Sequence, residues 1–239
     1  GAARGAARAG GTHPRQNLIG RLFSQVLKAK AITTIEHLSK TISVNMMSFF
    51  ASRRQINCTP VQMQCWPSAF SGHDVFSIAP HAPGTCHAWS LPALQHVLAN
   101  HTFQVSEDVG TPQVLVLAHD TESVVRLTTV CQDLFANEGL YCSAIDTTMI
   151  FDQIQESITV STPRELLKAM AKNLVDLSSV SFLVIEDAQL IAELPLGVLA
   201  QVRGALRPDR QTLVFASYAG AKTNRLAELY ILHLLFVVL

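Results

Sequence analysis

Six short apolar runs recur along the body of the chain and alternate with segments of helical spacing. The runs are Val75–Ala79, Gln113–Ala118, Cys142–Ile145, Ser157–Val160, Phe182–Ile185 and Thr212–Phe215. The helical segments include Val124–Phe135, Pro163–Leu174 and Leu196–Leu206. Continuous apolar strands that alternate with helices are typical of a mostly parallel sheet covered by helices on both faces. We therefore predict a three-layer α/β fold.

The length of the chain suits one large domain of this kind. With 239 residues, of which 49% are hydrophobic and 15% charged, a second full domain would not fit. We expect a basic low-complexity arm over residues 1–30, the α/β lobe over 35–231 and an apolar tail over 232–239. The tail is too short to cross a bilayer, so we expect no membrane partner, and the tail either packs as a core element or marks a truncated chain.

Charge is distributed unevenly along the sequence. The residues before Glu36 carry six Lys or Arg and no acid, which leaves 12 basic against 18 acidic side chains in the rest. A nucleic-acid-binding domain usually has the opposite balance. The Ala/Arg/Gly-rich arm cannot bury apolar surface and is predicted to be disordered. Four interpretations of the arm are open: a linker, a product of an inaccurate gene model, a mitochondrial targeting sequence, or an arm that contacts RNA phosphates.

The five cysteines include no C-x-x-C pair, which predicts neither a disulfide framework nor a zinc knuckle. His81, Cys86 and His87 lie close together but match no zinc-ligand spacing. We therefore expect a reducing environment, with the cytoplasm, including RNA granules, as the location and the mitochondrion as the alternative.

Polar residues follow four of the predicted strands. They are found in Ala79–Cys86, His119–Thr121, Glu186–Asp187 and Ser217–Tyr218. Ligands of open parallel sheets bind at the carboxyl ends of the strands. The sequence therefore predicts a ligand site along this edge.

The loop Ala79–Cys86 has the setting of a phosphate-binding P-loop but not its full chemistry. The usual loop reads G-x-x-x-x-G-K-[ST], whereas here Thr85 takes the position of the lysine and Cys86 that of the hydroxyl. A thiol is a poor ligand for Mg²⁺, and Pro83 removes one backbone N–H. Each lost charge-assisted contact costs about 1.5–3 kcal/mol. Nucleotide affinity should fall by one to several decades, and a surface loop that no longer binds phosphate is the alternative.

Taken together, these segments resemble the first RecA-like lobe of a DEAD-box RNA helicase, over roughly residues 35 to 231. Thr59-Pro60-Val61-Gln62 is similar to the Q motif of the family, and Arg210–Phe215 with Arg225–Ala227 is similar to the run around its third motif. The resemblance implies a RecA-like P-loop NTPase fold, and ATP and Mg²⁺ as weakly bound ligands. It also implies RNA, proteins of an RNA-processing complex and a second RecA-like lobe as partners.

The resemblance assigns roles to residues around the nucleotide. The candidates for nucleotide binding are Gln62, Ala82, Gly84, Thr85 and Cys86. Gln62 can pair with adenine, although Thr59-Pro60 is also a good helix start, so a structural role is the alternative. We expect no counterpart of the aromatic residue that stacks on the base in the family, because counting back gives His37, with Phe49 and Phe50 out of register.

The Asp-Glu-Ala-Asp box of the family stands here as Glu186-Asp187-Ala188-Gln189. Glu186 and Asp187 are the catalytic candidates, and Glu186 is also the candidate Mg²⁺ ligand. The exchanged side-chain lengths displace each carboxylate by about 1 Å, which is enough to cost ~10²-fold in positioning. Two acids that are simply solvated at a strand end are the alternative.

The motifs that face RNA in the family are altered further. Its Pro-Thr-Arg-Glu-Leu stands here as His119–Ser123, which lacks the arginine and adds an acid. Thr162, Pro163 and Arg164 are the RNA-binding candidates, since a helix N-terminus offers N–H groups to phosphate. A capping box between Thr162 and Glu165 is the alternative. The third motif, Ser-Ala-Thr in the family, includes Ser217 and Tyr218 as coupling candidates.

These departures predict a degenerate helicase lobe that serves as an RNA or protein interaction module with weak or no ATP hydrolysis. Animal germline Tudor-domain proteins of the Yb type, which act in piRNA biogenesis, carry helicase-like domains that have drifted in a similar way. The alternative is the N-terminal half of an ATP-dependent RNA helicase, which would not unwind RNA alone because the family closes ATP between two lobes. A fragment of a mispredicted gene, without independent function, is a third interpretation.

Overall fold

The computed structural model describes residues 32–79, 84–100, 110–145, 157–231 and 234–238. The strands are β1 (Asp74–Ile78), β2 (Val114–Leu117), β3 (Cys142–Ile145), β4 (Ile158–Ser161), β5 (Phe182–Ile185), β6 (Gln211–Ala216) and β7 (Leu234–Val238). The helices are α2 (Val44–Ser52), α3 (Pro60–Ala69), α4 (Thr85–Asn100), α5 (Thr121–Phe135), α6 (Pro163–Ala171), α7 (Ala188–Ile191), α8 (Leu196–Ala205) and α9 (Ala221–Tyr230). Short 3₁₀ turns cover Ile35–Leu38 and Ala136–Glu138.

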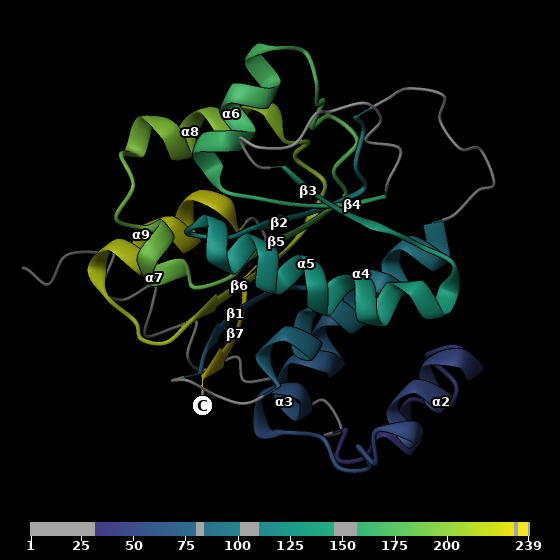
Figure 1. Ribbon diagram of the computed structural model, residues 1–239. Helices are drawn as coiled ribbons and strands as arrows, with labels where there is room; N and C mark the ends of the chain where they lie inside the picture. Colours follow the sequence, from purple (N-terminus) through teal and green to yellow (C-terminus); the bar gives the residue numbers. More distant parts are fainter. Residues whose placement is uncertain (1–31, 80–83, 101–109, 146–156, 232–233, 239) are drawn as a thin grey trace, which may run out of the picture.

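All seven described strands are parallel and form one sheet in the order β3-β4-β2-β5-β6-β1-β7 (Figure 1). The six predicted apolar runs correspond to β1–β6, with bounds that agree within one residue. They form strands because each run is rich in β-branched and aliphatic residues and is bounded by polar segments.

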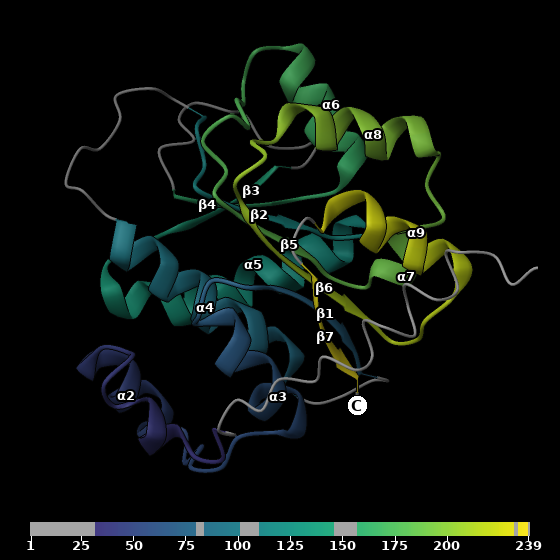
Figure 2. The same cartoon turned by 180° about the vertical axis from the view of Figure 1, so that it is seen from behind.

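Helices cover both faces of the sheet, as predicted, and each face carries its own core. Helices α2–α5 pack on one face, where Trp66, Trp89 and Phe135 are buried, and helices α6–α9 pack on the other, around Phe76 and Tyr230 (Figures 1 and 2). Successive strand residues point to opposite faces, so neighbours such as Val114 and Leu115 belong to different cores. The fold is a three-layer α/β sandwich.

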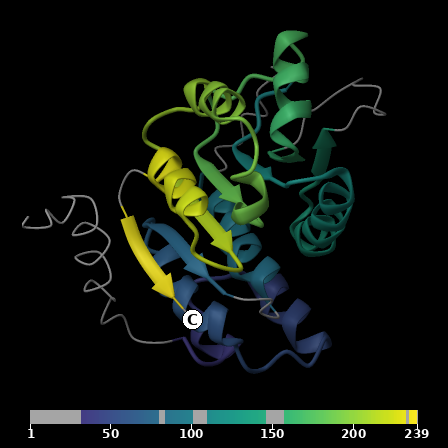
Figure 3. The same cartoon turned by 90° about the vertical axis from the view of Figure 1, so that its left-hand side faces the viewer.

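Residues 234–238, which the sequence assigned to an apolar tail, form β7 beside β1. The register pairs Asp74 with Leu234 and Ile78 with Val238, and Figure 3 shows β7 at the edge of the sheet. No helix in the described part of the chain is long and apolar enough to span a bilayer.

Two helices begin at the carboxyl edge of the sheet with side-chain caps. Asp120 Oδ1 accepts the N–H of Ser123 at 2.8 Å at the start of α5, and this bond holds the pKa of Asp120 below its ordinary value. Thr162 Oγ1 accepts the N–H of Glu165 at 3.3 Å at the start of α6. The reciprocal bond of a capping box, from the backbone N–H of Thr162 to the Glu165 carboxylate, is not formed among these described residues. The Glu165 carboxylate instead accepts a hydrogen bond from Lys168 Nζ at 2.7 Å.

Candidate active site

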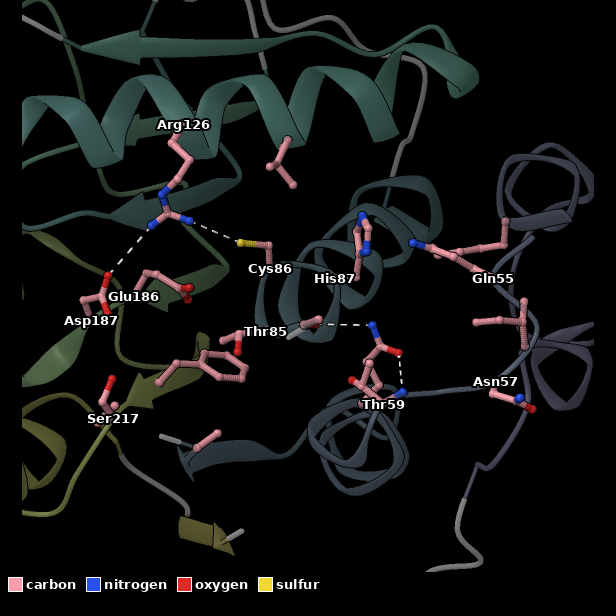
Figure 4. Close-up of a pocket in the computed structure, with 18 residues that line it drawn as sticks. Gln55, Asn57, Thr59, Thr85, Cys86, His87, Arg126, Glu186, Asp187 and Ser217 are labelled. Carbon is pink, nitrogen blue, oxygen red and sulfur yellow. Dashed lines mark hydrogen bonds and ion pairs between the residues drawn. The ribbon is translucent and has the colours of Figure 1, made fainter. Parts of the chain in front are cut away.

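A cavity of about 510 Å³ opens at the carboxyl ends of β1, β5 and β6 (Figure 4). One end of it, the acid end, is lined by Cys86, Arg126, Glu186, Asp187 and Ser217. The opposite end, the amide end, is lined by Gln55, Asn57 and Thr59, together with Gln62, whose side chain is hydrogen-bonded to Thr59. The parallel order of the strands is what brings these segments to a single edge, as predicted from the sequence.

Gly84 closes the loop that leads into α4. Its φ of +89° is a conformation that L side chains rarely adopt, and a Cβ there would lie 2.6 Å from Thr59 Oγ1 and 2.9 Å from Gln62 Nε2. Only glycine therefore fits this position without a shift of its neighbours. Thr85 and Cys86 form the first turn of α4 and line the cavity. Ala82, the remaining candidate of this loop, lies outside the described residues.

Gln62 is held by contacts within the protein. Its Oε1 accepts the backbone N–H of Thr59 at 2.9 Å, which caps α3, and its Nε2 donates to the carbonyl of Gly84 at 3.3 Å. The side chain is buried, with 5% of its surface exposed. Gln62 thus joins the start of α3 to the glycine of the loop while it lines the cavity.

Phe50, rather than His37, is the upstream aromatic residue that lies in the cavity wall. Phe50 lines the cavity together with His87, and the two rings meet edge to face with centroids 5.8 Å apart. Burial, together with the nearby Arg53, lowers the pKa of His87, so its imidazole is neutral near pH 7. Residue spacing alone could not predict this contact, because the position of α2 relative to α4 is set by tertiary packing.

The two acids of the box have different environments. Glu186 is buried, and its Oε2 has no hydrogen-bond partner among the described residues. Burial and the neighbouring Asp187 raise the pKa of Glu186 from 4.5 to about 8, so the carboxyl is mostly protonated at pH 7. Asp187 is partly exposed and adopts a left-handed backbone conformation with φ of +51°. Aspartate tolerates this conformation better than most residues.

Arg126 of α5 is a site residue that the sequence analysis did not identify. Its Nη1 donates to Cys86 Sγ at 3.5 Å, and its Nη2 lies 3.8 Å from Asp187 Oδ2 (Figure 4). His119 also approaches Asp187, with Nδ1 4.0 Å from Oδ2. A signal was present in the sequence, since the first turns of a helix that follows β2 must start at the same edge as the loop and the acid box.

Gln189 connects the acid box to the end of β6. Its Oε1 accepts the N–H of Ser217 at 3.0 Å, and its Nε2 lies 3.3 Å from Asp187 Oδ1 and 3.4 Å from Ser217 Oγ. Ser217 is thereby brought into the site as predicted. Tyr218 is 57% exposed and does not line the cavity.

The RNA-binding candidates lie apart from the cavity. Thr162, Pro163 and Arg164 start α6 at the carboxyl end of β4, which is separated from β5 by β2. Pro163 is buried and Arg164 is exposed. The backbone N–H of Glu165 is used by the Thr162 cap, so half of the capping box is present, and the role of these residues in RNA binding stays a prediction.

The residues present fit Mg²⁺ and ATP in part. The unpartnered, buried Oε2 of Glu186 is an oxygen ligand of the kind that Mg²⁺ prefers. Cys86 does not fit, because burial and the nearby Glu186 raise the pKa of its thiol to about 11 and keep it protonated. No group of three His, Cys, Asp or Glu side chains in the described ranges is arranged to hold a metal. A Mg²⁺ ion here would therefore be shared with substrate phosphates.

Two solved structures share this fold. A dbp5 variant of S. cerevisiae bound to a gle1 variant and IP6 superposes with a TM-score of 0.75 at 17% identity, over 87% of this chain and 53% of that one. A hypothetical ATP-dependent RNA helicase from Sulfolobus tokodaii gives a TM-score of 0.71 at 18% identity, over 83% and 57% of the two chains. These likenesses support the RecA-like α/β fold.

Sequence comparisons identify RNA helicases among the relatives of this chain. The ATP-dependent RNA helicase dbp2 of Schizosaccharomyces pombe is 31% identical over 182 residues, which cover 72% of this chain and 32% of that protein. DEAD-box ATP-dependent RNA helicase 30 of Arabidopsis thaliana is 32% identical over 187 residues, covering 72% and 30%. The chain thus spans about a third of the length of these curated relatives. A family model described as DEAD/DEAH box helicase matches residues 59–223, and the chain belongs to the DEAD/DEAH box helicase family.

Proposed function

We propose that this chain is the ATP-binding first lobe of an RNA helicase and that it binds ATP with reduced affinity in the cavity at the carboxyl edge. The observation that carries the proposal is the convergence of Gln62, Gly84 and the Glu186–Asp187 pair, from three separate segments, on one cavity of about 510 Å³. A cavity of this size suits a nucleotide. The polar side chains of the amide end offer both donors and acceptors to a base.

The acid end is suited to phosphate chemistry. Mg²⁺, when bound with ATP, supplies charge stabilisation to the phosphoryl group that is transferred. The Asp187 carboxylate faces the cavity and is able to orient an attacking water. Glu186 must lose its proton before it can act as a metal ligand, which makes slow hydrolysis the expected outcome.

Titration calorimetry of this chain with ATP, ADP and GTP in the presence of Mg²⁺ tests nucleotide binding. We expect saturable binding of ATP and ADP, weaker than in P-loop proteins that carry the lysine, and weaker still for GTP. The absence of any binding at millimolar nucleotide would contradict the proposal. Gly84→Ala, which fills the space beside Thr59 and Gln62, should reduce the affinity for both adenine nucleotides.

Hydrolysis is tested in the complete protein, because the relatives are about three times longer than the matched region. We expect RNA-stimulated phosphate release that Asp187→Asn abolishes. Asparagine retains the tolerance of a left-handed backbone, so this variant removes the carboxylate charge with little strain. Phosphate release that is unchanged in the variant would show that Asp187 has no catalytic role.

A second candidate function is an interaction module that has lost the ATP cycle. Three features favour it: Thr85 is uncharged, Cys86 is a protonated thiol, and Arg126 pairs with Asp187 inside the site. A role beside Yb-type Tudor proteins in piRNA biogenesis belongs to this candidate. RNA or protein binding by a chain that binds no nucleotide would support it, and RNA-stimulated phosphate release would exclude it.

RNA and other RNA-processing proteins are the partners that we propose, in the cytoplasm. All five cysteines are free, and four of them are buried, which is consistent with a reducing environment. Imaging of the tagged complete protein tests the location, and import into mitochondria would contradict it.

A further inference from the structure

The cavity needs a positive charge to hold a phosphate chain, and the position that supplies it in a P-loop is occupied by Thr85. Among the described residues that line the cavity, Arg126 is the single Lys or Arg. His87 does not replace it, because burial lowers the pKa of its imidazole. Among the described residues, the positive charge at the acid end therefore comes from α5.

The guanidinium of Arg126 lies beside Cys86, one of the two altered loop positions. Nη1 donates to Cys86 Sγ at 3.5 Å, and Cys86 follows Thr85 directly in the first turn of α4. Nη2 lies 3.8 Å from Asp187 Oδ2, on the opposite side of the acid end (Figure 4). The group thus spans the gap between the start of α4 and the acid box.

The contacts of Arg126 with Cys86 and Asp187 are weak. A thiol sulfur is a weak acceptor, and a separation of 3.8 Å to Asp187 is longer than a hydrogen bond. Nearly half of the Arg126 side chain, 48%, is exposed, so it has room to turn. A phosphate offers a guanidinium two parallel charge-assisted hydrogen bonds, which neither of its present partners does.

We propose that Arg126 is the phosphate-binding cation of this site and takes over, from α5, the task of the missing P-loop lysine. The guanidinium donates to oxygens of the phosphate chain and leaves Cys86, while Asp187 loses its pairing with Arg126 and faces the attacking water. This inference rests on the proposed function and names the residue that makes ATP binding feasible.

The test is a set of affinities measured by titration calorimetry for ATP, inorganic tripolyphosphate and adenosine. We expect Arg126→Ala to weaken ATP and tripolyphosphate about tenfold to a hundredfold, as for the loss of a charge-assisted contact, and to leave adenosine unchanged. Arg126→Lys should give an intermediate loss. Arg207→Ala, at an exposed arginine near the amino end of β6, is the matched control for net charge and should change none of the three.

A double-mutant cycle then tests whether Arg126 and a lysine at the position of Thr85 have the same function. Thr85→Lys should restore ATP affinity strongly in the Arg126→Ala background and raise it much less in the native background. Equal gains in both backgrounds would show that the two positions act independently and would overturn the inference.

Other results would also overturn it. Unchanged or tighter ATP binding by Arg126→Ala would identify Arg126 as a counter-ion of Asp187 alone, and an equal loss for adenosine would identify a structural role. Both of these leave the proposed function standing. A native chain that binds none of the three probes would overturn the proposed function as well. Melting temperatures of all variants verify that each one is folded.

Discussion

Ser217 and Gln189 are joined by a hydrogen bond of 3.0 Å, from the backbone N–H of Ser217 to the side-chain Oε1 of Gln189. The same amide places its Nε2 3.3 Å from Asp187 Oδ1. A neutral amide, at the position where the box of the family ends in an acid, thus connects the acid box to the end of β6.

This bridge should be sensitive to substitution. Gln189 is 7% exposed, so Gln189→Ala should lower the free energy of unfolding by about 1–3 kcal/mol, because buried partners lose their hydrogen bonds. Gln189→Glu keeps the acceptor for Ser217 but sets a second carboxylate beside Asp187. Its stability should therefore decrease further as the pH rises through the range in which carboxyl groups ionise. Urea unfolding of both variants at mildly acidic and neutral pH measures this, and a pH-independent difference between them would contradict it.

Gly84 should not accept a side chain. Gly84→Ala combines a left-handed φ with a Cβ placed 2.6 Å from Thr59 Oγ1, so we expect a loss of about 1–3 kcal/mol in the free energy of unfolding. Gly204→Ala is the matched control, since Gly204 lies in α8 with no atom within 4 Å of its Cβ position. The control should be neutral or stabilise by about 0.5–1 kcal/mol. Equal melting temperatures for the two variants would show that the loop relaxes freely.

Glu186 should make the protein less stable at alkaline pH. Its pKa of about 8 in the folded state lies above the ordinary 4.5, so the folded state binds this proton more tightly than the unfolded state. The free energy of unfolding therefore falls as the pH rises from about 4.5 to about 8, by on the order of 4 kcal/mol in total.

Glu186→Gln removes this dependence, because the amide has nearly the same shape and carries no charge. In Mg²⁺-free buffer the variant should match the native chain near the lower end of the range and exceed it in stability above about pH 8. Glu193→Gln, at an exposed acid paired with Lys222, controls for net charge. Parallel pH profiles for the native chain and Glu186→Gln would rule out a raised pKa at this carboxyl.

Variants at the start of α6 distinguish its role in helix capping from a role in RNA binding. Thr162→Ala should lower the free energy of unfolding by about 1 kcal/mol, because the N–H of Glu165 loses its acceptor, whereas Thr162→Ser should retain most of the stability. Arg164→Ala, at an exposed position, should leave stability unchanged. Fluorescence anisotropy with single-stranded RNA then decides the role of the segment. Weaker binding by Arg164→Ala alone assigns the contact to the arginine, and unchanged binding leaves α6 with its cap only.

The sequence by itself determined the architecture. An apolar strand such as β5 and the cap of α6 are encoded by consecutive residues, so pattern and side-chain chemistry predict them locally. Because the strands are parallel, the polar residues that follow them had to share one edge, which predicted the positions of Gly84, Glu186 and Ser217. The left-handed Gly84 is the kind of glycine that such a loop requires.

Tertiary structure decided which strand forms the edge of the sheet and which residues outside the motifs reach the cavity. β7 pairs with β1, whose residues are distant in the sequence, and no local pattern distinguishes such an edge strand from another apolar core segment. Arg126 reaches Cys86 and Asp187 only because α5 packs beside α4, and Phe50 reaches the cavity wall through the packing of α2. Apolar periodicity predicts which face of a helix is buried. The partners of a long polar side chain, in contrast, depend on which other elements pack beside the helix.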